Sequence, residues 1–311
     1  MDKGFRISVI VPIYNALDDL KKLLNSLYKN FNFELGEILL INDCSKENTS
    51  KFLAEYCKKD ERFRLINNEE NLGFVKTCNR GMREASGEIL VLLNSDTKIP
   101  SNFCEKIIKC IESDTQIGIA SPIGSYTAGY YAPLPFGCTL EKMNTKLEQV
   151  HKCTYPLIPA AEGFCFCIRR AVIEQQGLLD EIYGKGYHEE VDFAYRAVTN
   201  GWKYVLIDNL YVFHKRHASF GKKQREIQIA KNDAVFNERW YGFRENYIKE
   251  HNLQNPIIEI RKELGVKMPK YNYTFAEKIF SAKNTKDKKH KIISLLGIRI
   301  KLKRKQILLE H

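Results

Sequence analysis

The sequence predicts an α/β fold, a mostly parallel sheet flanked by helices, with a basic extension at its C-terminal end. Short apolar, β-branched runs such as Ile7–Ile13 and Glu88–Leu93 have the composition of strands buried on both faces of a parallel sheet. Segments with helical apolar periodicity lie between these runs, and this alternation indicates βαβ units. The chain has 311 residues, of which 44% are hydrophobic, so one large domain and an appendage are expected.

The predicted elements follow one another along the chain. Strands are expected at Ile7–Ile13, Glu37–Ile41, Phe63–Ile66, Glu88–Leu93, Gly163–Ile168, Lys203–Ile207 and Tyr211–Phe213. Helices are expected after Leu17 and at Asn48–Lys59, Phe74–Ser86, Ser101–Ser113, Glu189–Thr199 and Gln224–Lys249. The segment from Gly124 to Pro159 is rich in Pro, Gly and Tyr and is expected to be irregular. Because long irregular segments inside a domain are usually functional, this one is expected to shape a substrate site.

The net charge of +11 is concentrated in the C-terminal part of the chain. From Lys222 onward there are 22 Lys or Arg and 10 Asp or Glu, whereas the preceding part has 27 and 28. Such asymmetry suggests an anionic partner: a membrane surface, a nucleic acid or an acidic glycan. Lys278–His311 interleaves Ile and Leu with Lys and Arg, which predicts a basic amphipathic tail on an anionic membrane. A solvated basic end or a hairpin of alternating residues is the alternative.

The cysteines and the lengths of the apolar runs indicate the cellular compartment in which the protein is expected. There are nine cysteines at irregular spacing without a CxxC pair, which favours free thiols in a reducing cytosol. Met1–Ile7 lacks the layout of a signal peptide, and no run of about 18 apolar residues occurs. We therefore expect a cytoplasmic protein that is peripheral to the inner face of the cytoplasmic membrane.

Polar residues follow three of the predicted strands: Tyr14-Asn15, Asn42-Asp43 and Asn94-Ser95-Asp96. In open α/β sheets, ligands bind beyond the carboxyl ends of the strands. A carboxylate such as Asp96 at that edge suits a hard divalent cation that shares phosphate oxygens with a substrate. An Asp in an ordinary turn is the alternative for Asp96, but acidic groups at two strand ends of one sheet favour a site.

These segments carry a family resemblance. VPIYN (11–15), INDCS (41–45), NLGFVKTCNRGMREASGE (71–88) and LLNSDT (92–97) resemble the donor-binding half of the inverting glycosyltransferase family 2, which has the GT-A fold. GLLDE (177–181), GYHEEVDFAYRA (186–197) and YVFHKRHASFG (211–221) are similar to its acceptor half, as found in bacterial rhamnosyltransferase-like and O-antigen-type members. The expected domains are a catalytic domain at 1–221 (donor half about 5–121, acceptor half about 122–221), a helical extension at 222–275 and a basic tail at 276–311.

The resemblance implies a set of donor-binding residues. Asp43 is expected to hydrogen-bond the nucleobase, and Tyr14 and Asn15 to line the nucleotide site. Asn94-Ser95-Asp96 stands where the family has its DxD motif. Since Asn replaces the first Asp, Asp96 alone would supply the motif's charge to Mg²⁺ or Mn²⁺. The other donor-binding residues expected from the resemblance are Pro12, Asn71, Gly73, Asn79, Asn94 and Ser95.

The resemblance also implies the acid–base residues and a second metal ligand. Inverting transfer needs a base for the proton of the acceptor hydroxyl. Glu190 occupies the position of the family's base and Glu189 that of its neighbouring carboxylate, although acidic residues also favour the first turn of any helix. His214 is the expected metal ligand and His217 its rival. A zinc site from His188 and these two histidines fits no closed zinc spacing.

The sequence thus predicts a metal-dependent, inverting glycosyltransferase that uses a UDP- or dTDP-sugar. The acceptor would be a bacterial surface polysaccharide, a lipopolysaccharide or another lipid-linked glycan. Without GxxxxGK[ST], GxGxxG or GxSxG, readings as a kinase, dinucleotide oxidoreductase or α/β-hydrolase lose their main support. A nucleotidyltransferase is the enzymatic alternative, but it has no use for Glu189-Glu190. A nucleic-acid- or anionic-surface-binding protein acting through the tail would leave residues 1–221 unexplained, so no nucleic-acid partner is expected.

Overall fold

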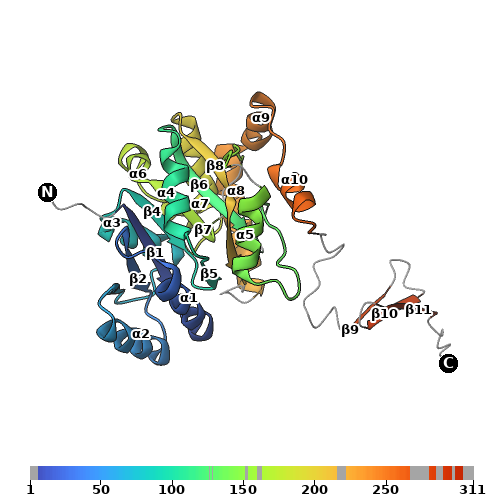
Figure 1. The fold of residues 1–311 in the computed structure, drawn as a ribbon, viewed down its shortest axis with the longest axis horizontal. Helices are drawn as coiled ribbons and strands as arrows, with labels where there is room; N and C mark the ends of the chain where they lie inside the picture. The colour runs from blue at the N-terminus through green and yellow to red at the C-terminus, as the bar shows by residue number, and fades with distance from the viewer. Residues whose placement is uncertain are drawn as a thin grey trace. The chain divides into compact units, whose positions relative to one another are not determined.

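The computed structural model describes residues 6–125, 127, 129–150, 153–159, 163–215, 222–266, 280–284, 290–295 and 298–303. The chain divides into two compact units, residues 1–266 and residues 267–311. Figure 1 shows the elements of both units, coloured along the chain.

The first unit is built on an eight-stranded sheet with the strand order β3-β2-β1-β4-β7-β6-β8-β5. Its strands are β1 (Ile7–Ile13), β2 (Gly36–Asn42), β3 (Phe63–Asn67), β4 (Ile89–Leu93), β5 (Thr97–Lys98), β6 (Ile117–Gly124), β7 (Cys165–Arg169) and β8 (Lys203–His214). Strands β1 to β4 are parallel, as are β6 and β8, whereas β7 runs antiparallel between β4 and β6, and β5 antiparallel to β8. This sheet confirms the predicted α/β fold class.

Helices cover both faces of the sheet (Figure 1). They are α1 (Leu17–Asn30), α2 (Glu47–Lys59), α3 (Phe74–Glu84), α4 (Phe103–Glu112), α5 (Leu140–Val150), α6 (Arg170–Gln176), α7 (Glu189–Thr199), α8 (Lys222–Trp240), α9 (Phe243–Glu250) and α10 (Pro256–Glu263). Buried residues of α1, α2 and α4 form one apolar cluster, and those of α3, α5, α6, α7 and α10 form a second. Val9 and Val11 belong to the first cluster and Ile10 to the second, because successive side chains of a strand point to opposite faces.

Several segments differ from the sequence prediction. Strand β6 and helices α6 and α10 were not expected, and the helix expected at Gln224–Lys249 is divided into α8 and α9. The region expected to be irregular contains α5, whose Met143 and Leu147 are buried four residues apart on one helix face. Strand β8 is continuous where two strands were expected, because the polar residues between them have partners inside the protein. Thr154 donates to the carboxylate of Asp208, and Lys106 donates to the carbonyl of Asn209.

Helices α8 to α10 belong to the same compact unit as the sheet. The end of α8 is bonded to α7 at Asp192, which is fully buried. Trp240 donates its ring N–H to this carboxylate at 2.8 Å, and Arg239 donates to it at 3.2 Å. The domain limits at 221–222 and 275–276 stay predictions.

The second unit contains three strands, β9 (Phe280–Asn284), β10 (His290–Leu295) and β11 (Ile298–Lys303). They form an antiparallel sheet in the order β11-β10-β9. The other residues of the predicted tail at 276–311 lie outside the described residues. Within the part of the chain that the structure describes, no helix is both long and apolar enough to cross a membrane.

Candidate functional site

The turns after β1 and β2 have an unusual backbone. Asn15, Ala16 and Cys44 have φ values of +60°, +53° and +53°. Such left-handed conformations cost about 1–3 kcal/mol each in residues other than glycine, and they concentrate at functional sites. The two turns are bonded together, since the Asn15 N–H donates to the Ser45 hydroxyl at 2.9 Å and the Lys46 N–H donates to the Asn15 side chain at 2.8 Å.

Asp43 connects the end of β2 to the start of α3. Its buried carboxylate accepts hydrogen bonds from the N–H groups of Leu72 and Gly73 at 2.8 and 3.0 Å, and from the Asn68 amide at 2.8 Å. Because the first N–H groups of a helix lack helical partners, a carboxylate at this position stabilises the helix start. A carboxylate has about four acceptor positions, so one remains for the predicted nucleobase contact.

The other predicted donor-binding residues near these turns differ in exposure. Tyr14 follows β1 and is 44% exposed, so its ring is accessible at the edge of the sheet. Pro12 is buried inside β1. Asn71 is exposed and donates its side-chain amide to the carbonyl of Asp43 at 3.2 Å. Their contacts with a donor stay predictions.

Asn79 is placed differently from the prediction. Its buried side chain donates to the carbonyl of Leu179 at 2.9 Å and to the carboxylate of Glu181 at 3.1 Å, and it accepts from the N–H of Leu179 at 3.1 Å. These bonds join α3 to a segment 100 residues further along the chain. Both ends of the amide are engaged here, so Asn79 braces α3 against this segment, and its predicted contact with a donor stays a prediction.

The pairing of β5 with β8 brings together the two predicted metal ligands. Thr97 lies opposite His214 in this ladder, so Asp96 is adjacent to the imidazole. The carboxylate Oδ1 of Asp96 and Nε2 of His214 are 3.4 Å apart, and each side chain is 12% exposed. The ring of His214 stacks on Phe164, with centroids 5.0 Å apart and an interplanar angle of 16°. The turn is fixed by Asn94, whose N–H donates to the carbonyl of Phe164 at 2.9 Å.

A carboxylate and an imidazole at this separation fit one divalent cation. Adjacent ligands of an octahedral ion with bonds of about 2.1 Å lie about 3.0 Å apart, close to the 3.4 Å between Asp96 and His214. Among the described residues, no group of three His, Cys, Asp or Glu side chains could hold a metal ion. Asp96 and His214 account for two ligands, and a Mg²⁺ or Mn²⁺ ion held by them would have further positions for substrate phosphates and water.

His188, which was also considered as a metal ligand, has other partners. His188 contacts Asp233 at 2.6 Å between Nε2 and Oδ1, and its ring stacks on Phe236 of α8. His217 lies outside the described residues. The zinc arrangement considered from the sequence thus has no support from His188.

The two candidate catalytic carboxylates stand at the start of α7. Glu189 is buried, with 4% of its surface exposed, and Glu190 is half-buried. Burial raises the pKa of both groups, and the adjacent charge of Glu190 raises the pKa of Glu189 further. Because two buried charges this close disfavour each other, the pair as a whole retains a proton more readily than two separate carboxyl groups would.

Each of these carboxyl groups has one oxygen to offer a ligand. Oε2 of Glu189 and Oε2 of Glu190 are buried and have no hydrogen-bond partner within the described part of the chain. Buried polar atoms are normally hydrogen-bonded, and exceptions are common where a substrate or water completes the site. The two oxygens are therefore candidate contacts for a ligand hydroxyl group.

Two consecutive residues before β7 contact the pair Asp96–His214 and the pair Glu189–Glu190. A Cβ atom added to Gly163 would lie 3.0 Å from Oε1 of Glu190, so glycine leaves room for that carboxylate. The next residue, Phe164, stacks on His214. On the other side, the buried thiol of Cys78 has its pKa raised by burial and then by the charges of Glu189, Asp43 and Glu190. The ends of β2 and β4 and the start of α7 therefore surround one site.

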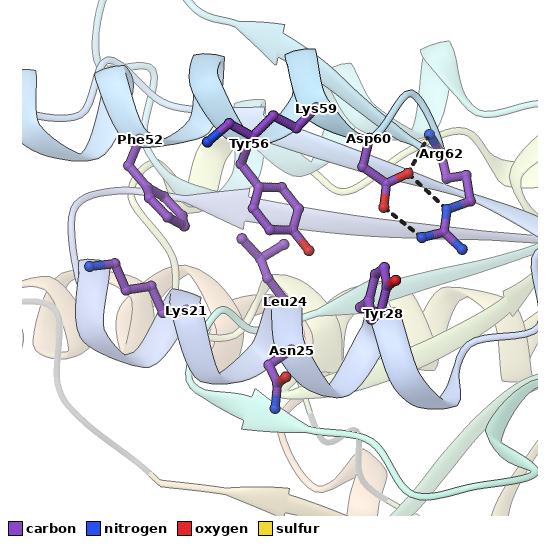
Figure 2. Close-up of a pocket in the computed structure, with 9 residues that line it drawn as sticks. All are labelled: Lys21, Leu24, Asn25, Tyr28, Phe52, Tyr56, Lys59, Asp60 and Arg62. Atoms are coloured by element: carbon purple, nitrogen blue, oxygen red, sulfur yellow. Dashed lines mark hydrogen bonds and ion pairs between the residues drawn. The ribbon is translucent and has the colours of Figure 1, made fainter.

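A separate groove lies between α1 and α2 (Figure 2). It has a volume of about 570 Å³, and Arg62 in its wall is bonded to the carboxylate of Asp60 at 2.8 and 2.7 Å. Burial and the nearby charge of Asp60 raise the pKa of Tyr56 to about 12. Its lining residues are Lys21, Leu24, Asn25, Tyr28, Phe52, Tyr56, Lys59, Asp60 and Arg62. None of the predicted site residues lines it.

Comparison with known proteins identifies a family for the chain. The model of "Glycosyl transferase family 2" matches residues 8–177. The chain is 30% identical over 201 residues to the putative glycosyltransferase EpsH of Bacillus subtilis, covering 61% of this chain and 55% of that protein. It is 33% identical over 100 residues to the putative teichuronic acid biosynthesis glycosyltransferase TuaG of the same organism, covering 32% and 39%. The chain thus spans about half or less of the length of these relatives.

Solved structures with a similar fold include GalNAc-T7 with UDP, GalNAc and Mn²⁺, with a TM-score of 0.62 at 20% identity over 85% of this chain and 56% of that one. A mannosyltransferase from Pyrobaculum calidifontis in complex with GDP-Man and Mn²⁺ has a TM-score of 0.54 at 16% identity, covering 83% and 69%. At these identities the likeness concerns the fold.

The raised pKa of Glu189 predicts how stability depends on pH. The folded protein binds the Glu189 proton more tightly than the unfolded chain, so stability falls as pH rises above about 4.5 toward the folded pKa. Glu189→Gln cannot ionise and should lose less stability between pH 4.5 and pH 8. We expect the variant to gain about 2 °C or more in Tm relative to the parent at pH 8. Thermal unfolding at both pH values checks this. Glu55→Gln, at an exposed position of α2, is the control, and identical pH dependence of Glu189→Gln and the parent would contradict the prediction.

Proposed function

Because the chain belongs to glycosyl transferase family 2, we propose that it is an inverting glycosyltransferase that uses a UDP- or dTDP-sugar. The proposed acceptor is a hydroxyl group of a bacterial surface glycan or of a lipid-linked glycan. The products would be the glycosylated acceptor and the nucleoside diphosphate. The relative TuaG, which is named for teichuronic acid biosynthesis, supports a role in building a bacterial glycan.

The donor would bind at the ends of β1, β2 and β4. Tyr14 is accessible for contact with the nucleotide, and Asp43 has one acceptor position left beside the turn after β2. Asp96 and His214 would hold Mg²⁺ or Mn²⁺ against the diphosphate. When bound, the cation supplies Lewis-acid stabilisation of the charge that develops on the departing nucleoside diphosphate.

Glu190 would act as the base toward the acceptor. The acceptor oxygen forms its bond to the anomeric carbon as the bond from that carbon to the diphosphate breaks, and the hydroxyl proton passes to Glu190. Glu189, whose pKa is raised by burial and by the charge of Glu190, would keep its proton and brace the Glu190 carboxylate. Desolvation raises the pKa of Glu190 toward the working pH, which makes its carboxylate a stronger base.

One observation carries this proposal: Gly163 and Phe164 are neighbours in the chain, and they contact the carboxylate pair and the predicted metal-ligand pair. The first lies against Glu190 and the second against His214. A site that combines a cation-binding pair with a separate carboxylate base suits sugar transfer. Nucleotidyl transfer, the alternative on a similar sheet, would release pyrophosphate and would have no use for the carboxylate pair.

Association with an anionic membrane is proposed for the C-terminal part of the chain. Residues 278–311 contain 11 Lys or Arg and 2 acidic residues. A basic segment gains about 1 kcal/mol per charge near an anionic lipid surface, and a location there would bring the enzyme to lipid-linked acceptors.

The role of the metal is tested with Asp96→Ala. Loss of this carboxylate should weaken binding of UDP in the presence of Mn²⁺ by about tenfold or more, because the cation bridges protein and diphosphate. Calorimetric titration of UDP, with and without Mn²⁺, measures the effect. Asp18→Ala, at an exposed position of α1, is the control. Undiminished UDP binding by Asp96→Ala, or full sugar transfer in excess chelator, would overturn the metal assignment.

The role of the base is tested with Glu190→Gln. The amide keeps the size of the side chain but cannot take a proton, so kcat should fall about a hundredfold or more while donor affinity changes little. The assay screens UDP- and dTDP-sugars for Mn²⁺-dependent release of nucleoside diphosphate, and then measures kcat and KM with the best donor. Glu189→Gln should retain more activity, since its amide can still donate to Glu190. Normal turnover by Glu190→Gln would exclude it as the base, and release of pyrophosphate would favour nucleotidyl transfer.

The membrane proposal is tested by deleting residues 278–311. The shortened protein should sediment less with vesicles that contain phosphatidylserine, and the difference should shrink at high salt because the attraction is electrostatic. Release of nucleoside diphosphate from the donor should be retained. Equal sedimentation of the full-length and shortened proteins would contradict the proposal.

A further inference from the structure

The loop that leads into the two candidate catalytic carboxylates has a costly backbone. In this loop, Tyr183–His188, four residues have positive φ: Gly184 at +60°, Gly186 at +120°, and Tyr187 and His188 at +76° each. Glycine adopts such values freely, but each of the other two costs about 1–3 kcal/mol. A loop of this shape persists only where the surrounding structure holds it, and Glu189 follows it directly.

The side chain of Asn232 in α8 supplies that hold. It is fully buried, and its Nδ2 atom lies 3.0, 2.8 and 2.9 Å from the carbonyl oxygens of Tyr183, Gly186 and Tyr187. Two amide hydrogens thus serve three carbonyl groups, so at least one hydrogen is shared. The orientation of the amide is unambiguous, because the opposite one would place its oxygen against three carbonyl oxygens.

Neighbouring residues of α8 reinforce this contact. Gln228 lies one turn earlier and donates to Oδ1 of Asn232 at 3.1 Å and to the carbonyl of Tyr183 at 3.3 Å. Asp233 binds the ring of His188 at 2.6 Å, and Phe236, one turn after Asn232, stacks on that ring. Side chains from Gln228 to Phe236 of α8 therefore contact both ends of the loop Tyr183–His188.

We propose that Asn232 is a positioning residue for Glu190. By holding three carbonyl groups of the loop Tyr183–His188, it fixes the start of α7 and with it the direction in which Glu190 faces the acceptor. The inference rests on the proposed function, in which Glu190 is the base. It assigns a role to α8, which lies beyond the residues that the family model matches.

Loss of the fixed position of Glu190 should change the turnover rate measurably. A displacement of about 1 Å at a reacting group can cost a hundredfold in turnover, because proton transfer needs close and aligned atoms. The space for Glu190 is tight, since the backbone at Gly163 leaves only van der Waals room beside its carboxylate. Without the amide of Asn232, the left-handed residues of the loop would relax, and Glu190 would lose its fixed position.

A double-mutant cycle tests the inference on the full chain. Asn232→Ala should lower kcat by about tenfold or more and change the KM for the donor less, because the hydrogen bonds of its side chain go to Gln228 and to the loop Tyr183–His188. In a Glu190→Gln background the same change should have almost no further effect, since the positioned group is already inactive. The substrate is whichever UDP- or dTDP-sugar gives the highest Mn²⁺-dependent release of nucleoside diphosphate. Asn237→Ala, at an exposed position of the same helix, is the matched control and should retain parental kinetics.

Hydrogen exchange gives a second measurement that does not depend on activity. The N–H groups of Gly184 and Gly186 are bonded to the carbonyls of Glu181 and Tyr183, and their exchange should become faster in Asn232→Ala and in Asn232→Asp. The Asp variant keeps the size of the side chain but removes its donors. Exchange in α1 should be unchanged in both variants, which shows that the fold is intact.

The outcomes separate the two proposals. If Glu190→Gln turns over normally, the base assignment fails, whatever Asn232 does to the loop. If Glu190→Gln is inactive but Asn232→Ala has parental kcat, or if exchange at Gly184 and Gly186 is unchanged, the positioning role is wrong. Equal losses from Asn232→Ala in the parent and in the Glu190→Gln background would show a general structural role and would also overturn it.

Discussion

Desolvation of two neighbouring carboxyl groups is the constraint on which the acceptor side of this structure depends. Glu189 and Glu190 lie together at the start of α7, and burial there disfavours two negative charges, so one proton stays with the pair. Such an arrangement needs a rigid frame, because hydrated and separated carboxylates would be lower in energy. The frame is provided by Gly163 on one side and by the loop fixed by Asn232 on the other.

Backbone strain and side-chain hydrogen bonds occur together on both sides of the site. On the donor side, Asn15 adopts a left-handed conformation and is bonded to the turn after β2. On the acceptor side, Tyr187 and His188 do so and are held by α8. In each case the stabilising contacts come from a different segment of the chain, so the energy for the strained turns is supplied by tertiary structure.

The sequence predicts residues that can be recognised from their neighbours along the chain, but it misses hydrogen bonds between distant segments. Asp43 and Asp96 are recognisable because polar groups directly follow apolar runs, and the Glu189-Glu190 pair is recognisable through the family resemblance of its segment, 186–197. The partners of Asn79 and Asn232 are 100 and up to 49 residues away, and apolar periodicity carries no information about where a single amide in a helix finds its acceptors. The direction of β7 was likewise hidden, because a short apolar run has the same composition in parallel and antiparallel surroundings.

The insertion of β7 between β4 and β6 has a consequence for synthesis of the chain. Strand β4 is wholly buried in the finished sheet, but the neighbour on one of its edges is made only when the ribosome has reached Arg169. At roughly 5–20 residues per second, the apolar run Ile89–Leu93 waits roughly 4–15 s with that edge unpaired. Unpaired apolar edges are templates for association with other chains, so the nascent donor half depends on chaperones or on rapid coverage by its own helices until the antiparallel strand arrives.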